Sequence, residues 1–389
     1  MWDTARVEHV RFEAGRRILV MSDLHAVPSF FDGLLRAVDF GREDILVLVG
    51  DLMEKGTDSL GLLHRVMEVA QSHTVYTVCG NCDELVYRFV DTQGKDAGWE
   101  DFYRRYLPQH PESAIWQFAR WAGCPEDRLN VDGFAHMRRA MRENCGKELD
   151  FLRRMPHILE TEHYVFVHGG VPSMEHMDGL SAFHVMKNDD FLSQGYSFDK
   201  YCIVGHWPVT LYDPAIPNAS PLLCRDRRII SLDGGCALKA DGQLNALVIP
   251  EDGAQSFFWA AYDGLERVRA LDSQRASAHP LNIRWGHSRV QVLEQGEELS
   301  RCRHVESGRE LDILNQYLYR RQEETFCRDS TDYELPVEPG DMLALVARTK
   351  QGILAKKDGA TGWYRGRFTS ERNKDGYVGI SPLDPRGSG

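Results

Sequence analysis

The chain has 389 residues, of which 42% are hydrophobic and 27% are charged, and its formal net charge is −12. This length predicts one large domain with an appendage, and this composition excludes a mainly disordered chain. The negative charge, without a dense Lys/Arg block, argues against nucleic acid or an anionic membrane surface as the main partner.

The first residues lack a charged-then-apolar signal pattern, and no apolar run approaches the roughly 18 residues that a membrane span needs. Nine cysteines are scattered from Cys79 to Cys327, an odd number without the spacing of a disulfide framework. We therefore expect a cytoplasmic protein with reduced thiols and no membrane partner.

Short apolar runs rich in Val and Ile recur between residues 18 and 249, and each is predicted to be a β-strand. Six of them end at a polar residue or a glycine turn. They are 18–21 before Asp23 and His25, 45–49 before Asp51, 75–79 before Asn81, 164–167 before His168, 202–204 before His206, and 229–232 before Asp233. Where helices connect parallel strands, sites are built at the carboxyl ends of the strands.

Residues 30–40 and 59–71 have apolar side chains at helical spacing, so helices are expected between the strands. Residues 97–157 differ, because they mix many aromatic residues, such as Trp99 and Tyr106, with many charges. We predict a helical insertion there. It is either a cap with its own small core or a lid over a substrate, and both can be true.

Beyond Pro250 the pattern changes to short alternating runs and turns. We expect residues 1–272 to form the main domain, with the helical insertion at 97–157. A linker near residues 273–280 then leads into a C-terminal region at 281–389.

The candidate ligands comprise two Asp, three His and one Asn: Asp23, His25, Asp51, Asn81, His168 and His206. Carboxylate and imidazole together suit Mn, Fe or Zn better than Ca or Mg, and the lack of cysteine among them argues against a structural zinc. A carboxylate can bridge two cations, and two ions about 3.5 to 4 Å apart activate a shared water for in-line phosphoryl displacement. Each residue alone could be a turn or a cap, but six in this order favour a site for two divalent ions, with Mn as the expected metal.

Five motifs resemble, in the same order, those of the calcineurin-like metallophosphoesterases. They are Ser22-Asp23-Leu24-His25, Gly50-Asp51-Leu52-Met53-Glu54-Lys55-Gly56, Gly80-Asn81-Cys82-Asp83-Glu84, His168-Gly169-Gly170 and Gly205-His206-Trp207-Pro208. The chain most resembles the phosphoprotein phosphatase branch, with its serine/threonine phosphatases and symmetrical diadenosine tetraphosphatases. The resemblance covers about residues 16–250.

The resemblance implies an α/β fold of two packed mixed β-sheets flanked by helices. It implies that Asp23 and His25 bind the first metal, that Asp51 bridges both metals, and that Asn81, His168 and His206 bind the second. It also implies direct attack on phosphorus by a metal-bridging hydroxide, so no phosphoenzyme is expected.

Cys82 departs from the family pattern, in which a histidine follows the asparagine and protonates the leaving group. A thiol has an unperturbed pKa of about 8.5 and is a poorer proton donor when desolvated. A phenolate, with a pKa of about 10, or a phosphoanhydride leaves with less help than a serine alkoxide. Cys82 therefore favours aryl phosphate, anhydride or diester substrates, unless Asp83 or another group supplies the acid.

Glu54 and Lys55 replace an Asp-Arg pair of the eukaryotic members, and Lys187 stands near a phosphate-binding arginine of the family. Lysine lacks the bidentate fork of arginine, so we expect looser binding of phosphate in the ground state. The predicted catalytic residues are Asp51, Asn81, Cys82, Asp83 and Glu54, and the predicted phosphate-binding residues are Lys55 and Lys187.

Residues 332–383 contain an acidic start, a Gly-Asp turn before an apolar strand, a Trp-Tyr pair and a Gly-Tyr-Val close. In that order they resemble an SH3-like β-barrel, so we expect a small all-β barrel in the C-terminal region. Tyr333, Trp363 and Tyr377 either line a groove for a peptide ligand or pack the barrel and dock it on the main domain.

Three functional hypotheses follow. The leading one is a metal-dependent phosphatase that hydrolyses phosphomonoesters, in a phosphorylated protein (Ser/Thr or Tyr) or a small molecule. The alternative is a nucleotide phosphohydrolase or phosphodiesterase, acting on a dinucleoside polyphosphate or a diester. The third is a pseudoenzyme that acts as a binding module, against which the retention of every metal-ligand type counts.

Overall fold

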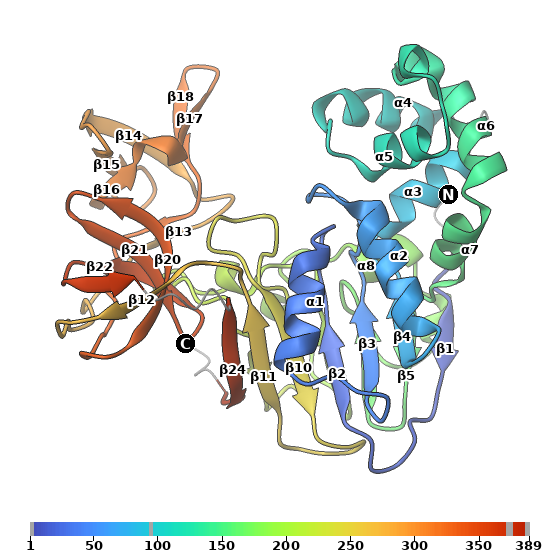
Figure 1. Ribbon diagram of the computed structural model, residues 1–389, viewed down its shortest axis with the longest axis horizontal. Helices are drawn as coiled ribbons and strands as arrows, with labels where there is room; N and C mark the ends of the chain where they lie inside the picture. The colour runs from blue at the N-terminus through green and yellow to red at the C-terminus, as the bar shows by residue number, and fades with distance from the viewer. Residues whose placement is uncertain (1–3, 93–95, 371–375, 386–389) are drawn as a thin grey trace.

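The computed structural model describes residues 4–92, 96–370 and 376–385. Two six-stranded mixed sheets form its centre (Figure 1). The first sheet has the order β1 (Val7–His9), β5 (Ile158–Glu160), β6 (Tyr164–Val167), β7 (Tyr201–Val204), β9 (Ile229–Ser231), β8 (Leu222–Cys224). The second has the order β24 (Tyr377–Pro382), β11 (Phe258–Tyr262), β10 (Leu244–Ile249), β2 (Ile18–Met21), β3 (Ile45–Val49), β4 (Thr74–Val78).

The two sheets pack face to face through their apolar runs. Ile18, Val20 and Val47 of the second sheet share one buried cluster with Phe166 and Ile203 of the first. The alternate residues of β2 and β3 belong to the core on the other face, beneath the helices. Strands that are buried on both faces have continuous apolar sequences. The expected fold class, two packed mixed sheets flanked by helices, is confirmed.

All six apolar runs that precede the candidate residues are strands. In the second sheet β2 is parallel to β3 and β3 to β4, and in the first sheet β6 is parallel to β7 and β7 to β9. Parallel strands in one sheet end at the same edge, so the ends of these strands form two groups of three, and the candidate residues that follow them are brought together within each group.

Helices cover the outer face of the second sheet (Figure 1). The helices of this layer are α1 (Pro28–Ala37), α2 (Ser59–Ala70) and α3 (Asn81–Asp91). The segment predicted as an insertion contains α4 (Ala97–Tyr106), η1 (Leu107–Gln109), α5 (Ala114–Trp121), η2 (Glu126–Arg128), η3 (Val131–Gly133), α6 (Phe134–Asn144) and α7 (Gly146–Arg154). Shorter helices follow: η4 (Met177–Gly179), α8 (Ala182–Met186), η5 (Phe191–Gln194) and η6 (Val209–Leu211). None of the helices in the described part of the chain is both long and apolar enough to cross a membrane.

The insertion packs on α3 through aromatic side chains. Phe89 of α3 makes edge-to-face contacts with Tyr103 of α4 and Phe134 of α6, each at 5.1 Å between ring centroids. The buried Arg138 donates to the Phe89 carbonyl and pairs with Glu100. Phe89, Tyr103 and Phe134 belong to the same buried cluster as residues of β2 and β3, so the insertion is continuous with the main core.

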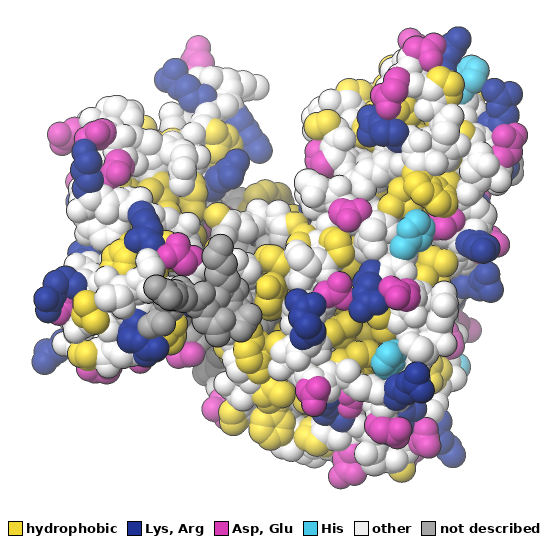
Figure 2. All heavy atoms as spheres, in the orientation of Figure 1, with side chains coloured by type: hydrophobic (Ala, Val, Ile, Leu, Met, Phe, Trp, Pro, Cys, Tyr) yellow, Lys and Arg dark blue, Asp and Glu magenta, His cyan; other side chains and the backbone are white. Residues whose placement is uncertain are grey.

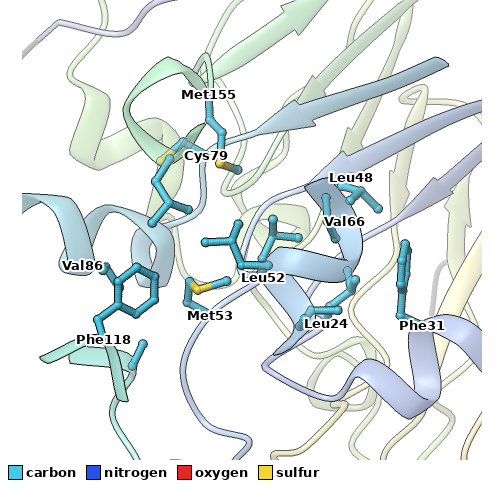
Figure 3. Close-up of a cluster of buried hydrophobic side chains, with 14 of the residues drawn as sticks. Leu24, Phe31, Leu48, Leu52, Met53, Val66, Cys79, Val86, Phe118 and Met155 are labelled. Atoms are coloured by element: carbon cyan, nitrogen blue, oxygen red, sulfur yellow. The ribbon is translucent and has the colours of Figure 1, made fainter. Parts of the chain in front are cut away.

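The loops that carry the candidate ligands are anchored in this core. Leu24 follows Asp23, and Leu52 and Met53 follow Asp51; all three side chains are fully buried. Figure 3 shows them directed into a cluster that includes Val66 and Phe118. Because Asp23 and Asp51 are each followed by a buried apolar side chain, their loops are held in place by hydrophobic packing.

The C-terminal region forms antiparallel sheets on one side of the molecule (Figure 1). One sheet has the order β22 (Ala360–Tyr364), β21 (Gly352–Lys357), β20 (Met342–Thr349), β12 (Arg267–Ala270), β23 (Phe368–Ser370). A second has the order β16 (Glu310–Leu314), β15 (Leu299–His304), β14 (Arg289–Glu294), β18 (Glu324–Cys327), β17 (Leu318–Arg321). A third pairs β13 (Asn282–Ile283) with β19 (Ser330–Thr331), and η7 spans Asn315–Tyr317.

Strand pairing crosses the predicted boundary at residues 272–281 in both directions. β12, which precedes it, pairs with β20 and β23 of the C-terminal region. β24, which follows it, pairs with β11 at the edge of the second central sheet. The division into residues 1–272 and 281–389 stays a prediction.

The structure bears on the two alternatives given for Tyr333, Trp363 and Tyr377, a peptide groove or packing. Tyr333 and Trp363 are buried, at 6% and 5% exposure, and the Trp363 indole donates to the Thr331 carbonyl. Tyr377 lies in another sheet, in β24. The packing alternative therefore holds for Tyr333 and Trp363.

Buried polar contacts fix the C-terminal sheets against the central domain. Lys356 of β21, 2% exposed, pairs with Asp263 at 2.9 Å and donates to the Asp241 carbonyl at 3.0 Å. Asn282 donates to the carbonyls of Thr210 and Asp213, at 3.0 and 2.7 Å. Because residues 210–213 lie shortly after His206, this contact supports a loop that carries a candidate ligand.

Candidate dinuclear metal centre

The candidate ligands follow strands in tight turns with left-handed backbone. Asp23, His25, Asp51 and His206 have φ values of 56°, 45°, 53° and 67°. For residues other than glycine this conformation costs about 1–3 kcal/mol each, and it clusters at functional sites. Gly205 is required beside them, because a Cβ there would clash with Ser22 Oγ and Asp23 Oδ2.

Asp51 lies between two groups of donor atoms. Its Oδ1 is 3.3 Å from His168 Nε2, and its Oδ2 is 4.0 Å from His25 Nε2. The ligand atoms of Asp51, His168 and His206 lie within 4.8 Å of one another, as do those of His25, Asp51 and Cys82. A carboxylate shared by two groups of donors has the position that a bridging ligand needs.

Asp23 lies beside the same groups. Its Oδ1 is 3.8 Å from His25 Nε2 and 4.0 Å from His168 Nε2. Its carboxylate also accepts from the Ser22 hydroxyl and, at 3.0 Å, from the His206 backbone N–H. Asp23 therefore connects loops of the two sheets.

Among the candidate ligands, two buried atoms that could bind a metal have no hydrogen-bond partner: His168 Nε2 and Asn81 Oδ1. The other nitrogen of His168, Nδ1, lies 2.8 Å from the Val49 carbonyl, which leaves Nε2 as the nitrogen available to a ligand. Buried polar atoms usually have a partner, and a metal-bound histidine usually donates its other N–H to a carbonyl or carboxylate. The donor set of carboxylate, imidazole and amide oxygen thus fits two divalent ions.

The site has strong electrostatic coupling. Burial opposes protonation of His168, but Asp51 and Asp23 outweigh it and raise its pKa to about 10. Burial has the largest effect on Asp23. Together with the charge of Asp51 it raises the pKa of this carboxyl group to about 7, although His168 partly lowers it. A concentration of buried negative charge of this kind favours bound cations.

Asp189 orients His206. Asp189 Oδ1 lies 2.8 Å from His206 Nε2, and the hydrogen bond from His206 lowers the pKa of Asp189. The ammonium group of Lys187 lies 3.5 Å from the same oxygen. Asp189 is thus a carboxylate that holds a candidate ligand, His206, in place. The sequence analysis did not single it out, although Asp-rich residues 188–190 adjoin Lys187.

Asp83 supports the loop of Asp51 from behind. Its Oδ1 accepts from the backbone N–H groups of Leu52 and Met53, and its Oδ2 accepts from those of Asp51 and Gly80, at 2.8 to 3.1 Å. Burial and the neighbouring Asp51 raise the pKa of Asp83 to about 7. Because the four donors occupy both oxygens, the contacts of Asp83 suit a positioning role; the catalytic role expected from the sequence stays a prediction.

The Glu54 carboxylate is likewise occupied by hydrogen bonds. Its fully buried carboxylate accepts from the Ser113 hydroxyl at 2.7 Å, the Ala114 N–H at 3.0 Å and the Tyr106 hydroxyl at 3.1 Å. All three donors belong to the insertion. These contacts make Glu54 a link between the Asp51 loop and the insertion; the catalytic role expected from the sequence stays a prediction.

The family model for calcineurin-like phosphoesterases matches residues 16–229. The chain belongs to this family. The match contains all six candidate ligands, and it includes the insertion. The match contains the strands from β2 to β8 of the two central sheets, whereas β10, β11 and β24 of the second sheet and the C-terminal sheets lie outside it.

Solved structures similar to this calcineurin-like phosphoesterase include three phosphatases by name. A putative diadenosine tetraphosphatase is 19% identical over 63% of this chain and 94% of its own, with a TM-score of 0.42. A cold-active protein-tyrosine phosphatase of the psychrophile Shewanella sp. is 13% identical over 66% and 80%, with a TM-score of 0.36. A protein serine/threonine phosphatase from Saccharomyces cerevisiae is 11% identical over 67% and 84%, with a TM-score of 0.36. A comparison with curated protein sequences gives no match.

A cavity of about 560 Å³ opens beside the ligands of this calcineurin-like phosphoesterase. Asn81 and Cys82 line it together with Lys55 and Lys187, the two lysines expected to bind phosphate. The structure therefore brings both lysines to the same cavity as two of the predicted catalytic residues.

Aromatic side chains form the outer wall of this cavity: Trp99, Phe102, Tyr106 and Phe183. The sequence analysis noted the aromatic content of residues 97–157 without assigning a surface. The sequence does indicate an aromatic helix face, because residues 99, 102 and 106 have the i, i+3, i+7 spacing of one face.

Proposed function

We propose that this calcineurin-like phosphoesterase hydrolyses phosphomonoesters with two divalent ions held by the six candidate ligands. The observation that carries the proposal is the position of Asp51 between two groups of buried donors. Two ions bound there would lower the pKa of a shared water and withdraw charge from the phosphoryl oxygens. Carboxylate, imidazole and amide donors suit Mn, Fe or Zn, and Mn is the metal that we propose.

The chain's own residues position the substrate. Lys55 and Lys187 present ammonium groups to the cavity, where they would hold the phosphoryl oxygens. Asp189 holds His206, and Asp83 holds the backbone of the Asp51 loop. Water attacks phosphorus directly in this scheme, because the residues around the cavity offer no better nucleophile: burial, and then Asp51, raise the pKa of the Cys82 thiol well above its usual range.

A second candidate, a nucleotide phosphohydrolase or phosphodiesterase, is favoured by the same cysteine. Cys82 is 4% exposed, and a thiol with a raised pKa gives up its proton poorly. Leaving groups that need no protonation, such as an aryl oxide or the phosphate of an anhydride, suit this position better than a serine or threonine alkoxide. A phosphoprotein substrate would therefore carry phosphotyrosine.

The test is a substrate panel on metal-reconstituted protein. The panel contains p-nitrophenyl phosphate, its bis ester, phosphotyrosine and phosphoserine peptides, and diadenosine tetraphosphate. We expect turnover that is abolished by chelation and by Asp51→Asn, with fewer than two ions bound in the variant. Two bound ions without turnover of any substrate would overturn the proposal in favour of the pseudoenzyme. Full activity of Asp51→Asn with both ions bound would refute the bridging role.

For the C-terminal region we propose an SH3-like module with a structural role. Five antiparallel strands, β12 and β20 to β23, form one sheet around a core that includes Val268, Leu343 and Tyr364. All nine cysteines lie among the described residues and none forms a disulfide. We propose a cytoplasmic setting, in which thiols stay reduced.

A further inference from the structure

The aromatic wall of the cavity is built by two helices. Trp99, Phe102 and Tyr106 lie on one face of α4, and Phe183 comes from α8. Each of these four side chains is only half-buried. Half-buried aromatic side chains that line one cavity next to a reactive centre are the kind of surface on which a planar ligand stacks.

Contacts within the protein hold the wall in place. The rings of Phe102 and Tyr106 are stacked, with 5.2 Å between centroids and 17° between planes, and Tyr106 stacks on His110 at 3.9 Å. The Tyr106 hydroxyl donates to Glu54, three residues after Asp51. The orientation of the wall is therefore coupled to the loop that carries the bridging candidate.

The cavity begins beside the candidate metal ligands. Cys82 lines it, and the ligand atom of Cys82 lies within 4.8 Å of those of His25 and Asp51. A phosphoryl group at the ligands, with its oxygens toward Lys55 and Lys187, would thus direct its leaving group along Cys82 to the aromatic wall.

The acidic groups of the cavity already have partners. Glu84 is hydrogen-bonded to Arg88 of the same helix. Asp96 caps α4 by accepting from the N–H groups of Gly98 and Trp99. With these carboxylates committed, the remaining surface of the wall is apolar and aromatic. The cationic side chains that line the cavity are Lys55 and Lys187, of which Lys187 also pairs with Asp189.

From this arrangement we infer that the cavity is a leaving-group subsite for a planar aromatic ring, either an aryl ring or a nucleobase. The inference rests on the proposed phosphoester hydrolysis and adds a substrate class to it. A volume of about 560 Å³ lies within the range of about 300–1,000 Å³ that is usual for small-molecule sites. The subsite selects the ring that leaves and does not contribute to the attack.

The kinetic test is Phe102→Ala in the metal-reconstituted protein, with three substrates. p-Nitrophenyl phosphate carries an aryl leaving group, diadenosine tetraphosphate carries nucleobases, and acetyl phosphate carries a ring-free leaving group of low basicity. We expect kcat/KM to fall about 10-fold for a ring-bearing substrate, the usual size for the loss of one stacking ring, and to change less than about 2-fold for acetyl phosphate. A fall only with p-nitrophenyl phosphate identifies an aryl ring, and a fall only with diadenosine tetraphosphate identifies a nucleobase.

Two variants serve as controls. Phe102→Tyr keeps the ring and should retain the wild-type selectivity. Trp121→Ala removes a half-exposed aromatic side chain of α5 that does not line the cavity, and it should leave all three rates within about 2-fold. Equal loss with all three substrates in Phe102→Ala would overturn the inference, because a ring-binding surface cannot act on a ring-free substrate.

A binding test separates this inference from the proposed function. Phenylphosphonate and methylphosphonate are not hydrolysed, so calorimetric titration of both into metal-loaded protein needs no turnover. We expect phenylphosphonate to bind about 10-fold more tightly, an advantage that Phe102→Ala removes and Phe102→Tyr keeps. Equal affinity of the two phosphonates overturns the subsite even if hydrolysis is observed. Failure of hydrolysis with this preference intact overturns the proposed function alone.

Discussion

Replacement of Glu54 by alanine should loosen the insertion. The loss of local stability can be worked out from three hydrogen bonds. The Ser113 hydroxyl and the Ala114 N–H are buried and would lose their acceptor, at about 1–3 kcal/mol each. The half-buried Tyr106 can turn to water and adds little. Burial raises the pKa of Glu54, so removal of this carboxylate recovers part of its desolvation cost. The expected net loss is about 3 kcal/mol.

Hydrogen exchange measured by mass spectrometry is the suitable assay, because it reports the local opening of α5 rather than the unfolding of the whole chain. A loss of about 3 kcal/mol corresponds to roughly 100-fold faster exchange of protected amides in Ala114–Trp121. Glu126→Ala is the control: its ion pair with Arg120 is at the surface, with 72% and 55% exposure, so exchange should change by less than about 3-fold.

A double-mutant cycle identifies the mechanism. Ser113→Ala removes one of the three donors, and we expect Glu54→Ala and Ser113→Ala together to cost about 1 kcal/mol less than the sum of the single variants. Additive effects would show that the two side chains do not interact. Loss of activity in Glu54→Ala with unchanged exchange of α5 would refute the linking role and return Glu54 to catalysis.

Cys82→His should raise kcat on alkyl phosphates more than on aryl phosphates, because imidazole can protonate a basic leaving group; equal gains on both classes would contradict the role given to this position. Asp83→Asn should destabilise the protein to urea by about 3 kcal/mol and weaken metal binding, because one amide oxygen cannot accept all four backbone N–H groups; unchanged metal affinity would contradict the positioning role. Lys356→Met should also cost about 3 kcal/mol, because it removes the buried partner of Asp263, whereas the matched surface variant Lys350→Met should cost less than about 1 kcal/mol. Equal losses at the two lysines would show that burial of the ion pair is unimportant.

The sequence predicted the central fold because its strands carry an unambiguous signal. Ile18 to Met21 and Ile45 to Val49 are continuous apolar runs, buried on both faces, and each ends at a polar residue in a tight turn. Asp51 and His168, 117 positions apart in the chain, come within 3.3 Å of each other. The two residues follow strands of different sheets, so their proximity was expected only from the resemblance to a known family.

The roles of Glu54, Asp83 and Asp189 could not be read from the sequence. Each depends on which groups of other segments reach its carboxylate: the insertion for Glu54, four backbone N–H groups for Asp83, and His206 for Asp189. Sequence position gives no information on such contacts. The choice between a groove and packing for Trp363 was open for a related reason, because the sequence places Trp363 on a strand but does not say whether another layer covers that face.

The return of β24 to the central domain bears on how the protein is made. β11 occupies residues 258–262, but the strand that completes its outer side, β24, occupies residues 377–382 and is synthesised much later. A nascent chain folds from its N-terminus as it emerges, so β11 remains an open sheet edge while more than a hundred residues are added. Such an edge can pair with another chain, and a late premature stop would therefore leave an aggregation-prone product even though every candidate metal ligand had been made.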